Sequence, residues 1–149
     1  QSLVDSGETE LPITDFGMTR FWISLKQGVE LVIKALAESK GGETFIAIIP
    51  SVKITDLAKA ILPNCAMKEV GIREGEKLHE VMITKEDALY TFEYEKHFII
   101  YPHMSWWTPE KAVPGGKPVA KGFEFSSGTN SRWLSVEDLQ RLLAEVKEH

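Results

Sequence analysis

The spacing of apolar residues predicts two helices in the first half of the chain. After Ser24, with Gln27 as its capping-box partner, large apolar residues recur at helical intervals until the glycine pair at 41–42. This apolar stripe consists of Leu25, Val29, Val32, Ile33 and Leu36. Residues 55–62 place four apolar residues on one side and are followed by Pro63. We therefore expect a first complete helix after Ser24 and a shorter one over 55–62.

The last predicted helix has the clearest start signal. Ser135 is followed three residues later by Asp138, and Leu134 and Leu139 are spaced for a hydrophobic staple. Its predicted buried face consists of Leu139, Leu142, Leu143 and Val146. At the other end of the chain, residues 1–6 before a glycine have the pattern of a helix tail. This pattern suggests that the chain opens inside a helix.

Short extended segments alternate with these helices. They are predicted at 11–15, 18–23, 43–49, 67–72, 91–101 and 123–125, and Thr84 with Asp87 is predicted to open a short helical turn. Residues 43–49 are continuously apolar, which is typical of a strand without a solvated face, and Pro50 ends them. The segment 105–122, rich in proline, glycine and lysine, is predicted to be an exposed loop. The order of elements predicts a mixed α/β fold, with residues 1–149 as a single domain.

Composition excludes several classes of function. The formal net charge of −5 argues against nonspecific nucleic-acid binding, and no apolar run approaches the ~20 residues of a membrane span. The single cysteine, Cys65, cannot form an internal disulfide, which suits a cytoplasmic protein. The four histidines lack the spacing of a zinc site, so we expect no metal, and His97 and His103 are interpreted as satisfied structural residues. Sequence patterns for a serine nucleophile or a glycine-rich phosphate loop are absent.

The charged segment 71–80 carries the strongest chemical signal. Arg73 can donate two parallel hydrogen bonds to a phosphate, and Glu76 can accept from sugar hydroxyls or hold that arginine in place. A solvated surface loop is the alternative for such a charge run. Arg20, with the hydroxyl of Thr19 beside it, is a second anion candidate, for which a structural salt bridge is the alternative. The pair Trp106–Trp107 is a candidate interface or lid.

Three segments together resemble one family. They are Leu-Pro-Ile-Thr-Asp at 11–15 with Met-Thr-Arg-Phe-Trp-Ile at 18–23, Gly-Ile-Arg-Glu-Gly-Glu-Lys-Leu-His-Glu at 71–80, and Ser-Gly-Thr-Asn at 127–130 before a capped helix. In this order they resemble the C-terminal half of the inverting UDP-N-acetylglucosamine 4,6-dehydratases of surface glycan biosynthesis. These enzymes belong to the extended short-chain dehydrogenase/reductase superfamily. The resemblance implies the small substrate domain of such an enzyme, without its Rossmann half.

The resemblance also implies roles for individual residues. Ile13 and Thr14 would pass the uracil, Arg20 beside Thr19 would bind the diphosphate with Arg73, and Glu76 would contact the ribose. Two departures from the family pattern make the proposed phosphate site less positively charged. Glu74 stands where the family usually has proline, and residues 16–17 replace a more basic stretch.

The family's chemistry needs NADP and a Tyr-x-x-x-Lys pair, and the sequence contains no such pair. We therefore expect no catalytic residue and no cofactor site in this chain, with a UDP-sugar as its ligand. The alternatives are a stand-alone nucleotide-sugar-binding module and an assembly subunit that pairs with a separate Rossmann chain or with copies of itself. The last alternative predicts an exposed apolar face.

Overall fold

A computed structural model describes residues 10–147, which form two compact units. Unit 1 takes in the described parts of Gln1–Trp22, Pro50–Glu80 and Ser127–His149, and unit 2 takes in Ile23–Ile49 and Val81–Ser126. Both units combine helices with short strands, so the predicted mixed α/β fold is confirmed. The helix tail predicted at 1–6 lies outside the described residues.

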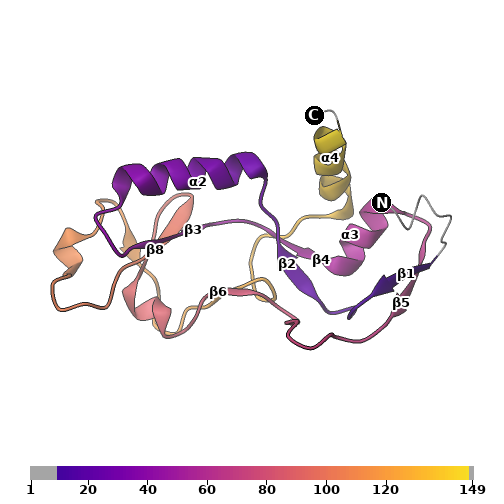
Figure 1. Ribbon diagram of the computed structural model, residues 1–149, viewed down its shortest axis with the longest axis horizontal. Coiled ribbons are helices and arrows are strands. Elements are labelled where there is room, and N and C mark those ends of the chain that lie inside the picture. The colour runs from indigo at the N-terminus through magenta and orange to yellow at the C-terminus, as the bar shows by residue number, and fades with distance from the viewer. Residues whose placement is uncertain (1–9, 148–149) are drawn as a thin grey trace. The chain divides into compact units, whose positions relative to one another are not determined.

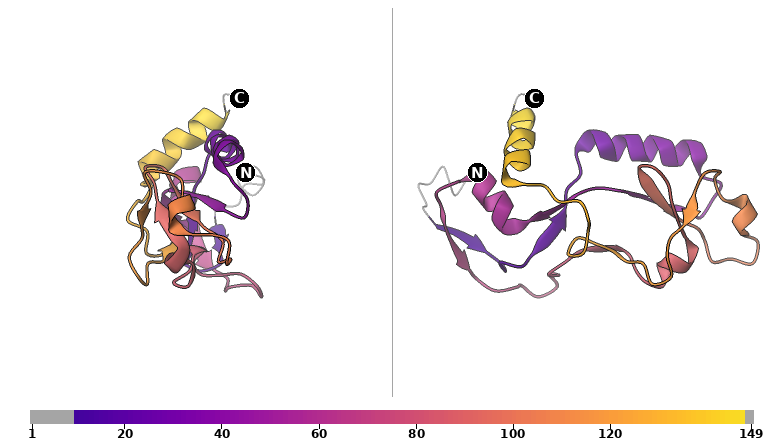
Figure 2. Two further views of the ribbon diagram at one scale, coloured as in Figure 1. Left: turned by 90° about the vertical axis from the view of Figure 1, so that its left-hand side faces the viewer. Right: turned by 180° about the vertical axis from the view of Figure 1, so that it is seen from behind.

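In its described residues, unit 1 is built from two pairs of strands and two helices (Figures 1 and 2). Its elements are β1 (Glu10–Ile13), β2 (Thr19–Phe21), β4 (Ser51–Lys53), α3 (Ile54–Ile61), β5 (Ala66–Glu69) and α4 (Val136–Lys147). β1 pairs with β5 in parallel, and β2 pairs with β4 in antiparallel orientation. α4, yellow in Figure 1, packs beside α3. The chain thus returns twice to the same unit, which brings residues far apart in sequence together.

The core of unit 1 forms between β4, α3 and α4. Val52, Ala60 and Leu139 are buried there. The residues that pack against them are Trp22, Leu57, Leu134, Val136 and Leu143.

The predicted start of α4 is confirmed. Ser135 Oγ accepts from the Asp138 N–H at 3.1 Å, and the Asp138 carboxylate accepts from the Ser135 N–H and hydroxyl. These bonds, with one from Arg141, hold the pKa of Asp138 below its usual range. The predicted burial of Val146 lies outside the described side chains.

Unit 2 contains a four-stranded antiparallel sheet with one long helix beside it (Figure 1). Its elements are α2 (Leu25–Glu38), β3 (Thr44–Ala47), β6 (Val81–Ile83), η1 (Asp87–Tyr90), β7 (Thr91–Glu93), β8 (His97–Ile100), η2 (Pro109–Lys111), β9 (Lys117–Pro118) and β10 (Phe125–Ser126). The sheet order is β3-β8-β7-β9, and β10 pairs separately with β6. The capping box of Ser24 and Gln27 is present as predicted.

Several strands differ from the sequence prediction. The strand predicted over 43–49 is limited to β3, and its Thr44 is exposed, so the expectation of a strand without a solvated face is wrong. β4 and β6 were not predicted, because three-residue strands owe their existence to a partner strand rather than to local propensity.

The segment 105–122 is mostly exposed but contains η2 and β9. Trp107 stacks on Tyr101 with ring centroids 4.7 Å apart, while Trp106 is exposed.

His97 is a buried structural residue, as predicted, but it is not fully satisfied. Its ring stacks between Phe45 and Tyr94, with centroids 5.8 Å and 4.9 Å away. Among the described residues, Nε2 has no hydrogen-bond partner. Burial, reinforced by the charge of Lys34 and opposed by that of Glu38, lowers the pKa of the imidazole below 6.5.

We expect His97 to make the chain less stable as the pH falls below 6.5. The unfolded chain takes up a proton there and the folded chain does not, so the free energy of unfolding falls until the lowered folded pKa is reached. Thermal denaturation at pH 7.5 and 5.5 measures this loss. His97→Phe, which keeps the ring stack, should reduce the loss. An equal loss in His97→Phe and the wild type would contradict this assignment.

Candidate functional site

The segment 70–80 of unit 1 begins at the paired strands β1 and β5. The N–H of Val70 donates to the carbonyl of Ile13 at 2.8 Å, directly after the last register pair of the two strands. Ile13 is buried, and Thr14, which follows it, is half-buried. Gly71 then adopts a φ of 92°, which favours glycine. The first two predicted site residues therefore lie where this segment leaves the strands.

A turn closed by Glu76 presents Arg73. The N–H of Glu76 donates to the carbonyl of Arg73 at 3.1 Å, and the Glu76 carboxylate accepts from the N–H of Arg73 at 3.2 Å. Gly75, within the turn, has a φ of 83°. Glu76 thus holds the backbone of Arg73, and the arginine side chain is exposed. Within residues 10–147, no ion pair is formed by the Arg73 guanidinium.

The far end of the segment is fastened to β2 by a buried hydrogen-bond network. The hydroxyl of Thr19 lies 2.8 Å from His79 Nδ1 and 2.8 Å from Ser127 Oγ. Ser127 Oγ accepts from the N–H of Glu80 at 2.9 Å, and the Ser127 N–H donates to the Glu80 carbonyl at 2.8 Å. Thr19 and Ser127 are both buried. Three separate stretches of the chain meet here, so the network sets the position of the segment's end.

Arg20 lies beside this network and is partly engaged. Its Nη1 donates to the carbonyls of Thr19 at 2.7 Å and Leu78 at 3.3 Å. Its Nε lies 3.6 Å from a carboxylate oxygen of Glu80. The structural salt bridge considered as the alternative is therefore present. A guanidinium has five N–H donors, so these contacts still leave donors on Nη2 for an anion.

The structure groups the predicted residues along one segment. Thr19 and Arg20 contact its C-terminal end, Arg73 and Glu76 form its turn, and Ile13 and Thr14 lie at its start. His79 and Ser127 were missed as partners of Thr19. Both occur within the three segments that carried the resemblance, but only the tertiary structure shows that their side chains meet.

The arrangement suits an anionic ligand. Within residues 10–147, no group of three or more histidine, cysteine or acidic side chains is placed to hold a metal ion. Over the same residues, no helix combines the length and apolar character that crossing a bilayer requires. An exposed arginine on a glycine-containing turn can donate charge-assisted hydrogen bonds to phosphate oxygens. Arg20 is hydrogen-bonded to the carbonyl of Leu78, toward the end of the same segment, and has further donors.

Comparison with known proteins identifies similar chains. A family model described as polysaccharide biosynthesis protein matches residues 1–102. The inverting UDP-N-acetylglucosamine 4,6-dehydratase of Campylobacter jejuni serotype O:2 is 43% identical over 149 residues, covering 96% of this chain and 45% of the relative. A UDP-glucose 4-epimerase of Rickettsia typhi is 38% identical over 139 residues, covering 90% of this chain and 40% of the relative.

A solved structure is also similar. The X-ray structure of Pen from Bacillus thuringiensis matches with a TM-score of 0.80 and 29% sequence identity, covering 98% of this chain and 44% of that one. The chain therefore spans less than half the length of the relatives it matches.

Proposed function

Because this chain belongs to the polysaccharide biosynthesis protein family, we propose that it forms the nucleotide-sugar-binding domain of an enzyme of the UDP-N-acetylglucosamine 4,6-dehydratase type. The family predicted from the three sequence segments is confirmed, and the domain assignment over 1–149 is the proposal. In this proposal the segment 70–80 receives the diphosphate and ribose of a UDP-sugar. The observation that carries it is the exposed Arg73 guanidinium on a turn closed by Glu76.

Each predicted residue has a physical role in this binding. Arg73 pairs with a phosphate through its planar fork of donors, and Arg20 adds its remaining N–H groups. Glu76 keeps one carboxylate oxygen on the Arg73 backbone and offers the other to the ribose hydroxyls. The carbonyl of Ile13 accepts a hydrogen bond from the N–H of Val70, which fixes the backbone of Ile13 and Thr14 beside the uracil in this proposal. Glu74 places a second negative charge beside Arg73 and weakens the affinity.

The relatives support a shared ligand rather than a shared reaction. One is a dehydratase and the other an epimerase, and both act on UDP-sugars by name. Both match this chain over 90% or more of its length. A region shared by two enzymes that carry out different reactions on the same class of substrate is suited to binding that substrate. The UDP part, which the two substrates have in common, is therefore the part that we assign to this chain.

This chain does not fit the NADP that the family implies. Dinucleotide phosphates bind at a glycine-rich turn between a strand and a helix. Within residues 10–147, the link from β2 to α2 is Trp22–Ile23–Ser24, and α3 follows β4 directly with Lys53 as its N-cap. The link from β10 to α4 contains one glycine, Gly128. None of these links has the Gly-x-Gly-x-x-Gly pattern, so no hydride-transfer step is assigned to these residues.

We expect UDP and UDP-N-acetylglucosamine to bind the chain with micromolar affinity, and Arg73→Ala to weaken binding by about 10- to 100-fold. This range corresponds to about 1.5–3 kcal/mol for a charge-assisted hydrogen bond. Calorimetric titration of the wild type and the variant measures the change. Because the interaction is ionic and exposed, the affinity should also fall as salt rises.

Arg141→Ala is the matched control. Arg141 is an exposed arginine on α4 that pairs with Asp138, away from the segment 70–80 in sequence. Its replacement removes the same charge and should leave the UDP affinity unchanged. Equal affinities in Arg73→Ala and the wild type, or equal losses in both variants, would contradict the proposed site.

A further inference from the structure

A single aromatic residue lies, in sequence, between the residues assigned to the uracil and those assigned to the diphosphate. It is Phe16, in the link from β1 to β2, after Thr14 and before Arg20 (Figure 1). Phe16 is 45% exposed, and within residues 10–147 its ring takes part in no aromatic contact. The ring therefore has surface left for a ligand.

A tight turn fixes the backbone that carries this ring. The N–H of Met18 donates to the carbonyl of Asp15 at 3.2 Å, which closes a four-residue turn with Phe16 and Gly17 at its centre. The Asp15 carboxylate accepts from the N–H of Gly17 at 2.7 Å, and the Glu69 carboxylate accepts from the N–H of Phe16 at 3.0 Å. Because this backbone is already ordered, a ligand that binds to the ring loses little free energy in ordering it.

The same turn is fastened to both ends of the segment 70–80. Glu69, which holds the turn, is the last residue of β5 and directly precedes the segment. Near the segment's other end, a Cβ at Gly17 would lie 3.9 Å from Cδ1 of Leu78, and the N–H of Thr19 donates to the Leu78 carbonyl at 3.0 Å. The ring and the segment that receives the diphosphate thus belong to one connected part of unit 1.

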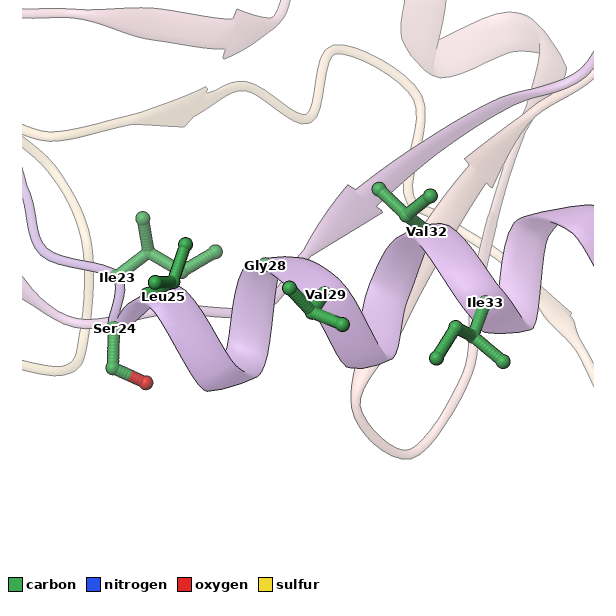
Figure 3. A pocket seen from close by; sticks show the side chains of 7 residues that line it. All are labelled: Ile23, Ser24, Leu25, Gly28, Val29, Val32 and Ile33. Atoms are coloured by element: carbon green, nitrogen blue, oxygen red, sulfur yellow. The ribbon is translucent and has the colours of Figure 1, made fainter.

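Apolar side chains are also exposed in unit 2, so exposure alone does not mark a ligand site. The stripe on α2 is exposed, from 48% for Val29 to 86% for Leu25, so the apolar face expected from the assembly alternative is present there. An open hollow beside it is lined by Ile23, Leu25, Val29, Val32 and Ile33 (Figure 3). Phe16 differs from this surface because it is aromatic and because its turn is fastened to the segment 70–80.

The charges around the ring favour an uncharged group over a phosphate. The carboxylates of Asp15 and Glu69 both accept from backbone N–H groups of the turn, so two negative charges lie close to Phe16. They repel a phosphate placed at this turn. The exposed surface of the ring is therefore suited to an uncharged planar group, while the phosphates remain with the arginines.

A nucleobase is the uncharged planar group of a UDP-sugar, and aromatic side chains bind bases by stacking. We propose that the Phe16 ring stacks on the uracil of the bound UDP-sugar. This inference rests on the proposed function and adds a contact to the same site. The face of a phenyl ring offers no hydrogen bond to the edge of a base, so Phe16 adds affinity without selecting uracil over other bases.

Titration of the 149-residue chain with UDP tests the stack. Phe16→Leu keeps an apolar side chain without the ring, so it should weaken UDP binding by about 5- to 10-fold and leave its salt dependence unchanged. Phe16→Trp keeps an aromatic face and should bind UDP at least as tightly as the wild type. The control Ile33→Ala, at an exposed side chain of α2, should leave the affinity unchanged. In proton NMR spectra, the wild type but not Phe16→Leu should shift the signals of the uracil ring protons upfield, because an aromatic face shields protons above it.

The stack is overturned, with the nucleotide site left in place, if Phe16→Leu binds UDP as tightly as the wild type while Arg73→Ala does not. Uracil signals that do not move upfield on the wild type overturn it as well. Equal losses of affinity in Phe16→Leu and Phe16→Trp, or a lower thermal midpoint of either variant, would mean that the ring shapes the turn instead of holding the base. If the wild type binds no UDP, the proposed function itself fails and the stack falls with it.

Discussion

Replacing Leu139 by alanine should lower the free energy of unfolding by about 3–4 kcal/mol, within the range for fully buried leucines. Leu139 has no exposed surface and forms the core of unit 1 with Val52 and Ala60. The lost isopropyl group leaves a cavity between α3, α4 and β4. These elements pack against one another and cannot move enough to fill it. Urea denaturation followed by circular dichroism measures the change.

Leu36→Ala provides the matched control. It makes the same substitution on another helix, at a side chain that is 80% exposed. In the isolated chain this change should cost less than about 0.5 kcal/mol, because little apolar surface is removed from contact. Similar losses in the two variants would mean that Leu139 is not the centre of an independent core.

We expect Gly128→Ala to lower the free energy of unfolding by about 2–3 kcal/mol. At positions with more space, replacing glycine by alanine is an ordinary substitution. A Cβ at this position would lie 2.6 Å from Cγ of the His79 ring, closer than atoms approach without displacement. The ring cannot move freely, because its Nδ1 is held 2.8 Å from the Thr19 hydroxyl. The substitution must therefore displace either the ring or the network around Thr19.

A double-mutant cycle identifies the clash as the cause. In a His79→Ala background the ring is gone, so Gly128→Ala should cost much less than it does alone. Gly28→Ala is the control for glycine replacement itself. It lies in a helix with open space around it and should stabilise the isolated chain by about 0.5–1 kcal/mol. Equal costs of Gly128→Ala with and without His79 would contradict a steric origin.

The sequence alone determined where α2 and α4 start. Ser24 with Gln27 and Ser135 with Asp138 cap α2 and α4 as predicted, because capping bonds join residues three positions apart. The turn between Arg73 and Glu76 was not predicted, although Gly75 and Glu76 are adjacent in the chain. The family could also be identified from sequence, since its motifs are contiguous segments.

Only the tertiary structure decided which distant residues meet. Ser127 reaches Thr19 across 108 positions and His79 reaches it across 60, and no local pattern encodes such a contact. β4 and β6 exist because a partner strand supplies their hydrogen bonds. Periodicity likewise revealed the apolar stripe of α2 but not its direction. The orientation of an amphipathic helix depends on which surface packs against it, and here β3 contacts the other face and leaves the stripe exposed.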